Sequence, residues 1–256
     1  MGRYGRTIPD IQLRLLGCHQ GEQDNRNKIY EIKNLALFTR VAKDLTKTDL
    51  VGNSTSYTEN GAITTIELRN PDTDAGFYAL RHTDPTSGSN ETFKLSVRTS
   101  AGNVTIPEKA GSLQLNGNYA KILVTDFKFG DELLIYSTAE ILTYGIFDKK
   151  PTLVLWVFNG EDGEFLMANA RQGKVTSCNK SEVVFTKSKH ALVVNFKKQH
   201  GRTAIELDNG IRVLILDRDA AHRFWVPGLT NDPRVPVDQT GAFLIIGRYS
   251  VGNELT

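Results

Sequence analysis

The sequence has little cysteine and no segment typical of export or membrane anchoring. Two cysteines, Cys18 and Cys178, occur in 256 residues, without a CxxC pair or a His/Cys cluster. This excludes a disulfide-built scaffold, and we expect two free thiols, with a single Cys18–Cys178 disulfide as the alternative. No run approaches the roughly 18 apolar residues of a membrane span, and the N-terminus lacks the apolar core of a signal peptide. As written, the chain is expected to be cytoplasmic and to have no membrane partner.

The charge shows no strong excess of either sign. The formal net charge at pH 7 is +2, and residues 1–48 hold nine Lys/Arg against five Asp/Glu, so the rest is slightly acidic. A nucleic-acid-binding domain would carry its basic residues on a face of the folded body. We therefore expect no nucleic-acid partner, although a weak basic N-terminal arm stays open beside a solvated helix face and tail.

No local motif for catalysis, phosphate binding or metal binding is present. The chain lacks G-x-S-x-G, P-loop and G-x-G-x-x-G patterns. Its histidines show neither H-x-x-x-H nor H-x-H spacing, so no metal, cofactor or catalytic residue is expected. For His82, at a strand end, a structural hydrogen bond is favoured over binding of a partner. The histidines are His19, His82, His190, His200 and His222.

Acidic residues cluster in two turn-like segments, NPDTDAG and NGEDGE. The first contains Asp72 and Asp74, and the second contains Glu161, Asp162 and Glu164. Paired-carboxylate catalysis needs two acids facing across a cleft, one of them with a raised pKa. Hairpin tips lie in water, so we expect five exposed carboxylates with ordinary pKa values. Cation binding is the alternative, but NGEDGE lacks the EF-hand spacing.

What the sequence has in abundance is β-branched residues. Val, Ile and Thr make up 57 of 256 residues, which favours strands over helices. Four Asn-Gly dipeptides, at 60–61, 116–117, 159–160 and 209–210, predict type I′ hairpin turns in an antiparallel meander. The predicted strands are 62–68, 77–82, 93–99, 121–127, 133–142, 152–158, 182–186, 191–196, 203–207, 212–217 and 242–247.

Two segments have helical character. The spacing of apolar residues predicts a helix over 24–48, capped by Asp24 or Asn25. A short late helix, AAHRFW, is predicted to be capped by Asp219 and stopped by Pro227. The first helix has one broad apolar side, made of Ile29, Tyr30, Ile32, Ala36, Leu37, Val41 and Leu45.

Two tryptophans and four sequons are the remaining candidate sites. Trp156 lies in a nearly continuous apolar strand and is predicted to pack in the core, whereas Trp225 is either packed or a sugar contact. The N-x-[ST] sequons indicate possible glycosylation and hint at secretory ancestry. They are Asn53, Asn90, Asn103 and Asn179.

Several longer stretches, in this order and spacing, resemble one known family. They are FYALRHTD (77–84), LSVRTSAGNVTIP (95–107), LLIYSTAEILTY (133–144), LVLW (153–156), ALVVNF (191–196) and VLILDRDAAHRFWVP (213–227). Together they resemble the second domain of the large, secreted fungal β-galactosidases of glycoside hydrolase family 35, over about residues 48–250. The helix YEIKNLALFTRVA resembles the last helix of that family's catalytic barrel.

The resemblance implies an all-β, mainly antiparallel fold with an N-terminal helix and one short late helix. It divides the chain into an unmatched tail (1–23), the barrel-helix remnant (24–47), a β-hairpin subdomain (48–148), an immunoglobulin-like β-sandwich (149–250) and a tail (251–256). The family's retaining hydrolysis of terminal β-galactosyl bonds uses carboxylates in the barrel. No position of this sequence matches them, so no catalytic residue is carried over.

These expectations lead to three hypotheses about function. The first is a non-catalytic structural domain of a β-galactosidase-like glycoside hydrolase, with the catalytic barrel and later β domains as partners. The second is a stand-alone galactoside-binding module, with Trp225 as the sugar contact. The third is an assembly element, because a barrel helix without its barrel exposes Ile29, Ile32, Ala36 and Leu37.

Overall fold

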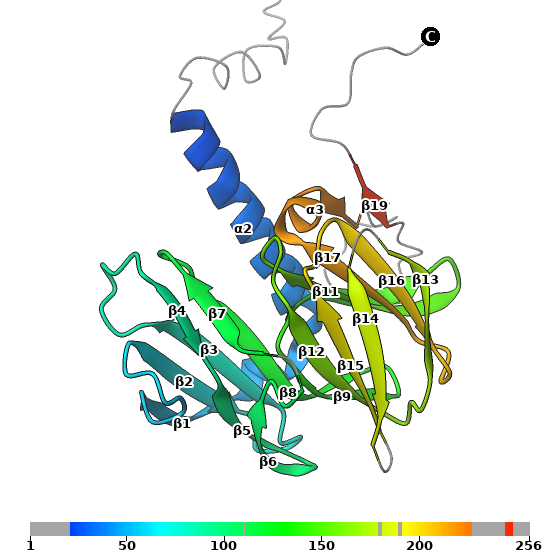
Figure 1. Cartoon of the computed structure of the whole chain (residues 1–256), viewed down its shortest axis with the longest axis horizontal. Coiled ribbons are helices and arrows are strands. Elements are labelled where there is room, and N and C mark those ends of the chain that lie inside the picture. Colours follow the sequence, from blue (N-terminus) through cyan, green and yellow to red (C-terminus); the bar gives the residue numbers. More distant parts are fainter. Residues whose placement is uncertain (1–20, 110, 179–180, 189–190, 227–243, 248–256) are drawn as a thin grey trace, which may run out of the picture.

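The computed structural model describes residues 21–109, 111–178, 181–188, 191–226 and 244–247. These residues form two α-helices, one 3-10 helix and nineteen strands (Figure 1). The helices are α2 (Gly21–Val41), η1 (Lys43–Lys47) and α3 (Arg218–His222). The first ten strands are β1 (Asp49–Ser54), β2 (Ile63–Arg69), β3 (Gly76–His82), β4 (Asn90–Phe93), β5 (Leu95–Thr99), β6 (Gly102–Ile106), β7 (Leu113–Asn116), β8 (Lys121–Phe129), β9 (Glu132–Ser137) and β10 (Glu140–Phe147). The others are β11 (Lys150–Val157), β12 (Gly163–Ala168), β13 (Gly173–Ser177), β14 (Glu182–Lys187), β15 (Ala191–Lys197), β16 (Arg202–Leu207), β17 (Arg212–Asp217), β18 (Phe224–Trp225) and β19 (Ile245–Ile246).

Two large sheets dominate the fold. Eight strands form a long sheet in the order β1-β2-β3-β8-β9-β12-β15-β14, and five form a second sheet in the order β10-β11-β17-β16-β13. Three small pairs, β4–β7, β5–β6 and β18–β19, complete the described part. Among the described strands, the β11–β17 pair is parallel and the other pairs are antiparallel. The all-β, mainly antiparallel class with an N-terminal helix and one short late helix is confirmed.

The predicted subdomain boundary falls within a pair of hydrogen-bonded strands. Segment 48–148 ends, and segment 149–250 begins, in the turn between β10 and β11. The long sheet takes β1, β2, β3, β8 and β9 from the first segment and β12, β14 and β15 from the second. The division into two subdomains therefore stays a prediction, as do the tails. Residues 251–256 and most of 1–23 lie outside the described residues.

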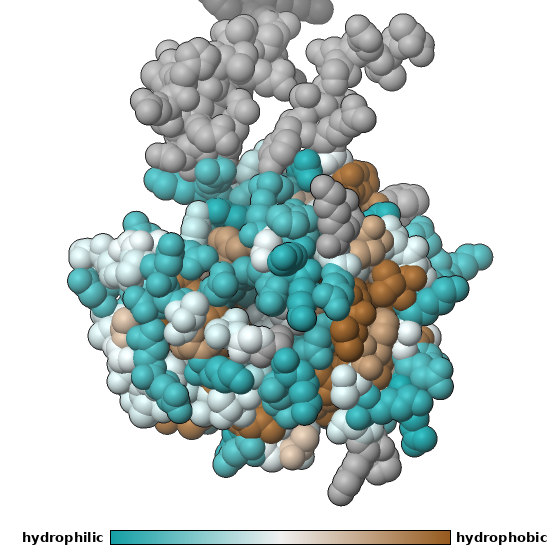
Figure 2. All heavy atoms as spheres, viewed as in Figure 1, coloured by the Kyte–Doolittle hydropathy of each residue, from teal (hydrophilic) through white to brown (hydrophobic). Residues whose placement is uncertain are grey.

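Three apolar cores hold the sheets together. The main core joins side chains from both sheets, and Phe38 and Val41 of α2 contribute to it. A second core packs the β4–β7 and β5–β6 pairs against the long sheet, and a third packs α3 and β18 against the five-stranded sheet. Successive residues of a strand point to opposite faces of its sheet. The long sheet therefore contributes side chains to the main core from one face and to the second core from the other, and the five-stranded sheet contributes to the main and third cores in the same way. Figure 2 shows one face of the molecule, where hydrophobic atoms gather over the region of β14 and β15.

Strand β11 illustrates why this sequence contains unbroken apolar runs. Leu153 and Leu155 point into the main core, while Val154 and Trp156 point into the third core. A strand buried on both faces needs apolar residues at every position, which explains the run TLVLWVF. The predicted core packing of Trp156 is confirmed, since its side chain is 7% exposed.

The first helix differs from its predicted limits. Helix α2 already includes Gly21, so neither Asp24 nor Asn25 caps it. It ends at Val41, and η1 continues the turn in 3-10 geometry up to Lys47. The helix packs against β10 and α3, and Figure 1 shows its N-terminal turns projecting beyond the strands.

The late helix is also shifted by two residues. Its N-cap is Asp217 rather than Asp219, because the Asp217 carboxylate accepts a hydrogen bond from the Ala220 N–H. It ends at His222, well before Pro227, which lies outside the described residues. Lys33 of α2 donates hydrogen bonds to three backbone carbonyls at the end of α3 and just after it, which fastens the two helices together.

The four Asn-Gly dipeptides do not form the predicted type I′ turns, since none of their asparagines has a positive φ. Asn209–Gly210 does join the paired strands β16 and β17. Asn159–Gly160 instead connects β11 to β12, which belong to different sheets. Two successive positive φ angles, 53° and 63°, occur at Asp148 and Lys149 between β10 and β11. The pairing of the flanking strands, which the dipeptide does not specify, decides the turn geometry.

The predicted strand 133–142 is two strands. β9 ends at Ser137 and β10 begins at Glu140, and the two belong to different sheets. The Ser137 hydroxyl donates a hydrogen bond to the Ala139 carbonyl and accepts one from the Ala139 N–H. These local bonds satisfy the backbone where the chain leaves one sheet for the other.

Candidate functional site

The NPDTDAG segment is a solvated loop, as predicted. The side chains of Asp72 and Asp74 are exposed. Asp74 pairs with Arg98, which is exposed as well. Such surface pairs contribute little to stability and show no sign of a cleft.

The prediction of an exposed loop is wrong for two acids of the NGEDGE segment. Glu161 is 6% exposed and Glu164 is fully buried, whereas Asp162 is exposed. The reason is topological. The segment crosses between the sheets instead of forming a hairpin tip, and β12 carries Glu164 into the long sheet.

Both buried carboxylates have fixed partners. Glu161 pairs with the buried Lys121 at 2.7 Å. Glu164 accepts hydrogen bonds of 2.7 Å from the Tyr136 hydroxyl and the Asn195 amide, and two more from backbone N–H groups of the segment after β6. Carboxylates engaged in this way stabilise the fold and do not form an acid pair across a cleft.

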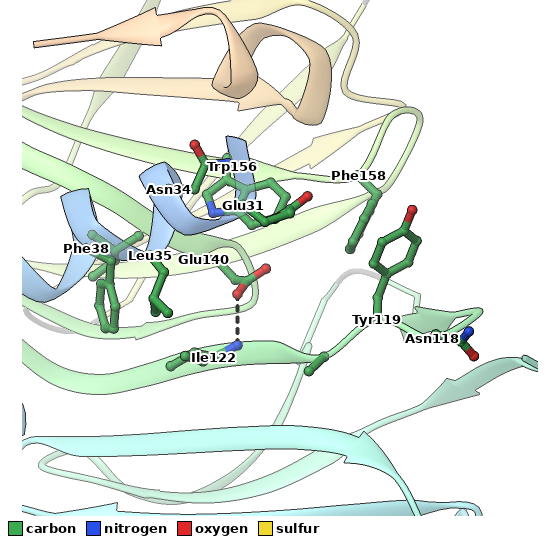
Figure 3. A pocket seen from close by; sticks show the side chains of 12 residues that line it. Glu31, Asn34, Leu35, Phe38, Asn118, Tyr119, Ile122, Glu140, Trp156 and Phe158 are labelled. Atoms are coloured by element: carbon green, nitrogen blue, oxygen red, sulfur yellow. Dashed lines mark hydrogen bonds between the residues drawn. The ribbon is translucent and has the colours of Figure 1, made fainter. Parts of the chain in front are cut away.

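A cavity of about 280 Å³ lies between α2, β10, β11 and the start of β8 (Figure 3). Its walls are largely apolar and aromatic, and a few polar side chains interrupt them. The apolar walls are Leu35, Phe38, Ile122, Ile141, Trp156 and Phe158. The polar residues are Glu31, Asn34, Asn118, Tyr119 and Glu140.

Glu140 points into this cavity from the first position of β10 (Figure 3). Its carboxylate accepts a hydrogen bond of 2.9 Å from the Ile122 N–H. Burial raises the pKa of Glu140 to about 8, although the charge of Lys121 and the Ile122 N–H act in the opposite direction. Among the described residues, no Lys or Arg forms an ion pair with Glu140, since Lys121 is paired with Glu161. Glu140 is therefore mostly protonated at neutral pH, and the charge that it acquires above about pH 8 has no direct counter-ion among the described residues.

A charged cluster borders the cavity on the α3 side. Glu31 Oε1 lies 2.8 Å from Arg218 and 3.1 Å from His222 Nε2. Burial opposes ionisation of Glu31, but the hydrogen bonds from His222 and Arg218 prevail and lower its pKa. The Arg218 guanidinium lies 4.5 Å from the Tyr119 ring centre and 5.4 Å from that of Phe158. Aromatic faces next to this cavity thus already hold a cation.

Asn34 is a polar residue in the buried stripe of α2. It is 4% exposed, and neither its Oδ1 nor its Nδ2 has a hydrogen-bond partner among the residues that the structure describes. It lies one helical turn from both Tyr30 and Phe38, so it occupies a position that normally carries an apolar side chain. The sequence analysis did not single out Asn34 or Glu140. The one feature that could have indicated them is that each is a polar residue within an otherwise apolar stretch, Asn34 in the first helix and Glu140 in the segment 133–142.

The other predicted site residues that the structure describes do not line this cavity. Asn53, Asn90 and Asn103 are exposed, and Asn179 lies outside the described residues. Trp225 is 49% exposed, and the Lys33 ammonium lies 4.8 Å from the centre of its ring. Glycosylation and sugar contact at Trp225 both stay predictions. Cys178 is an exposed free thiol, and Cys18 lies outside the described residues.

The histidines have separate environments. His222 stacks on Tyr30 and contacts Glu31, which is a structural role. The His82 ring is buried, and within the described part of the chain neither of its nitrogens makes the predicted structural hydrogen bond. His19 and His190 lie outside the described residues. In the part of the chain that the structure describes, no three His, Cys, Asp or Glu side chains come together as a metal site, and no helix has the length and apolarity to cross a membrane.

Comparison with known proteins identifies the family. A family model described as "Beta-galactosidase, domain 2" matches residues 45–224. The chain belongs to this family. It is 52% and 53% identical, over 88% of its length, to proteins named "Probable beta-galactosidase B" from Emericella nidulans and Aspergillus niger. A protein of the same name from Talaromyces marneffei is 46% identical over 98% of the chain. The chain spans 22%, 22% and 25% of these relatives, and the resemblance seen in the sequence is confirmed.

Proposed function

We propose that the chain is a non-catalytic structural domain of a β-galactosidase-like glycoside hydrolase. In this proposal, the outer face of α2 packs against a catalytic domain that hydrolyses terminal β-galactosyl bonds. The domain 2 family membership supports the role, and the relatives have about three quarters of their length outside the matched region. That length is ample for a catalytic domain.

The observation that carries the proposal is the pair of unlike faces on α2. Phe38 and Val41 are buried in the main core, whereas Ile29 and Ile32 on the outer side are 57% and 67% exposed. Leu35 is half exposed as well. A soluble helix seldom leaves such an apolar stripe in water, so a partner surface is expected to cover it.

One residue of the predicted outer face belongs elsewhere. Leu37 packs against the third core, so the outer stripe consists of Ile29, Ile32, Leu35 and Ala36. Self-association through this stripe is the alternative that the proposal must exclude. In that case two copies of this chain, instead of a catalytic domain, would cover it.

The experiment is an activity assay of the purified chain with a chromogenic β-galactoside. We expect no hydrolysis above the buffer rate, because Glu161 and Glu164 are engaged in the fold. Of the two acids that line the cavity beside α2, Glu31 is held by Arg218 and His222, so it is not free to act with Glu140 as a catalytic pair. Sustained hydrolysis that co-purifies with the chain would overturn the proposal.

A further inference from the structure

Once Glu140 is ionised, the cavity beside α2 contains one more carboxylate than it has cations to balance. Glu31 is paired with Arg218, and Glu161 is paired with Lys121. Glu140 is the fifth charged group of this cluster, and its only hydrogen-bond donor among the described residues is the Ile122 N–H. A carboxylate removed from water is costly unless a cation or several donors compensate it.

The shape of the cavity restricts what such a cation can be. At about 280 Å³ it lies just below the usual range for drug-sized ligands, so it suits a small group. Leu35, Phe38 and Ile122 provide apolar walls, and Trp156 and Phe158 provide aromatic ones. Apolar walls favour a hydrocarbon stem, and aromatic walls favour an organic cation over a hydrated metal ion.

We propose that this cavity binds an alkylammonium or alkylguanidinium group, with the cation at the Glu140 carboxylate and the stem along Leu35, Phe38 and Ile122. The proposal does not depend on the structural role proposed above. The chemistry is shared by a free small amine and by a Lys or Arg side chain of another protein. Glu31, Lys121, Tyr119, Glu161, Arg218 and His222 are the other charged or titratable groups around the site. Each has a partner within it: Lys121 pairs with Glu161, Arg218 and His222 contact Glu31, and the Tyr119 hydroxyl accepts a hydrogen bond from Arg218.

The direct test is a binding titration with n-butylammonium, monitored by Trp fluorescence. The chain has two tryptophans, so a Trp225→Phe background leaves Trp156 in the cavity wall as the reporter. We expect a saturable change with a dissociation constant on the order of millimolar. n-Butanol, which has the same stem without the charge, should bind at least about tenfold more weakly.

The pH dependence identifies the carboxylate. If Glu140 ionises near pH 8, the binding-competent fraction increases about tenfold from pH 7 to pH 9. An alkylammonium stays protonated over this range, as Lys does. Glu140→Gln keeps an acceptor for the Ile122 N–H, and it should abolish both the binding and its pH dependence. Asp131→Asn removes an exposed carboxylate elsewhere and should change neither.

A second ligand distinguishes the two sources of the cation. Nα-acetyl-lysine N-methylamide carries the same ammonium on a peptide backbone. Equal binding of both ligands supports a side chain from another protein, whereas binding of n-butylammonium alone supports a free amine. Equal binding of n-butanol and n-butylammonium, or binding unchanged in Glu140→Gln, overturns the proposal, and so does the absence of binding at pH 9. If Glu140→Gln does not fold, the pH series on the unmutated residue decides.

Discussion

Lys121 and Glu161 form an ion pair in which both side chains are almost fully buried, with 2.7 Å between Nζ and Oε2. Lys121 begins β8 of the long sheet, and Glu161 lies in the connection from β11 to β12. The Phe158 ring centre lies 5.2 Å from the ammonium. The pair therefore joins the first part of the long sheet to the crossing between the two sheets.

Breaking this pair on one side should be costly. Lys121→Met leaves the Glu161 carboxylate buried without its cation, and we expect the free energy of unfolding to fall by about 3–5 kcal/mol. Urea denaturation followed by circular dichroism measures it. The matched control is Lys150→Met in the exposed Lys150–Glu206 pair, which should lower the free energy of unfolding far less, because water and salt screen an exposed pair. Equal effects of the two substitutions would contradict the structural importance of the buried pair.

The pKa of Glu140 predicts a pH-dependent contribution to stability. The folded-state pKa is about 8 against an ordinary value of 4.5, so the folded state keeps a proton that the unfolded state releases. This contribution is complete below about pH 4.5 and is lost as the pH rises through 8. Glu140→Gln cannot ionise. Its free energy of unfolding, measured in urea, should therefore decline less than that of the unmutated chain from about pH 5 to pH 9. Parallel profiles would refute the assignment.

The main core should respond to loss of volume. Phe165 is fully buried there, and Phe165→Ala is expected to lower the free energy of unfolding by about 3–5 kcal/mol. Val184→Ala, on a 45% exposed side chain of β14, should change it by less than about 0.5 kcal/mol. Thermal unfolding by calorimetry compares the two, and a small effect of Phe165→Ala would show that this core is loosely packed.

The outer stripe of α2 should control association of the isolated chain. Ile29→Lys with Ile32→Lys removes most of its apolar surface, so we expect less self-association and higher solubility with unchanged circular dichroism. Val184→Lys places the same charge on an exposed apolar residue of β14. Size-exclusion chromatography with light scattering measures the mass. If Val184→Lys disperses the chain and the helix variant does not, the apolar surface around β14 is the contact instead.

Much of the fold was predictable because long apolar runs and the family resemblance agree. The segments 152–158 and 191–196 are nearly continuous apolar runs, and each is a buried strand. Weaker elements such as β1, β6 and β13 were missed, because their side chains are mostly exposed or half-buried and carry no apolar alternation. The split of 133–142 was missed since both of its strands are apolar, and the break depends on local hydrogen bonds at Ser137.

The candidate site was far less predictable than the fold. Glu161 and Glu164 stand among turn residues, and only the crossing between sheets explains their burial. Asn34 and Glu140 are separated by more than a hundred residues, and they line one cavity because α2 packs on β10. Sequence spacing contains no information on such a contact.

The activity of the isolated chain tests the central claim most directly. The purified chain is compared, at equal molar concentration and over the same pH range, with a full-length relative such as the Aspergillus niger protein named "Probable beta-galactosidase B". The substrate is a chromogenic β-galactoside, and the measured quantity is the rate of chromophore release. The account predicts a rate for the chain that cannot be distinguished from buffer. A sustained rate that follows the chain through purification and disappears when the chain is unfolded would contradict it.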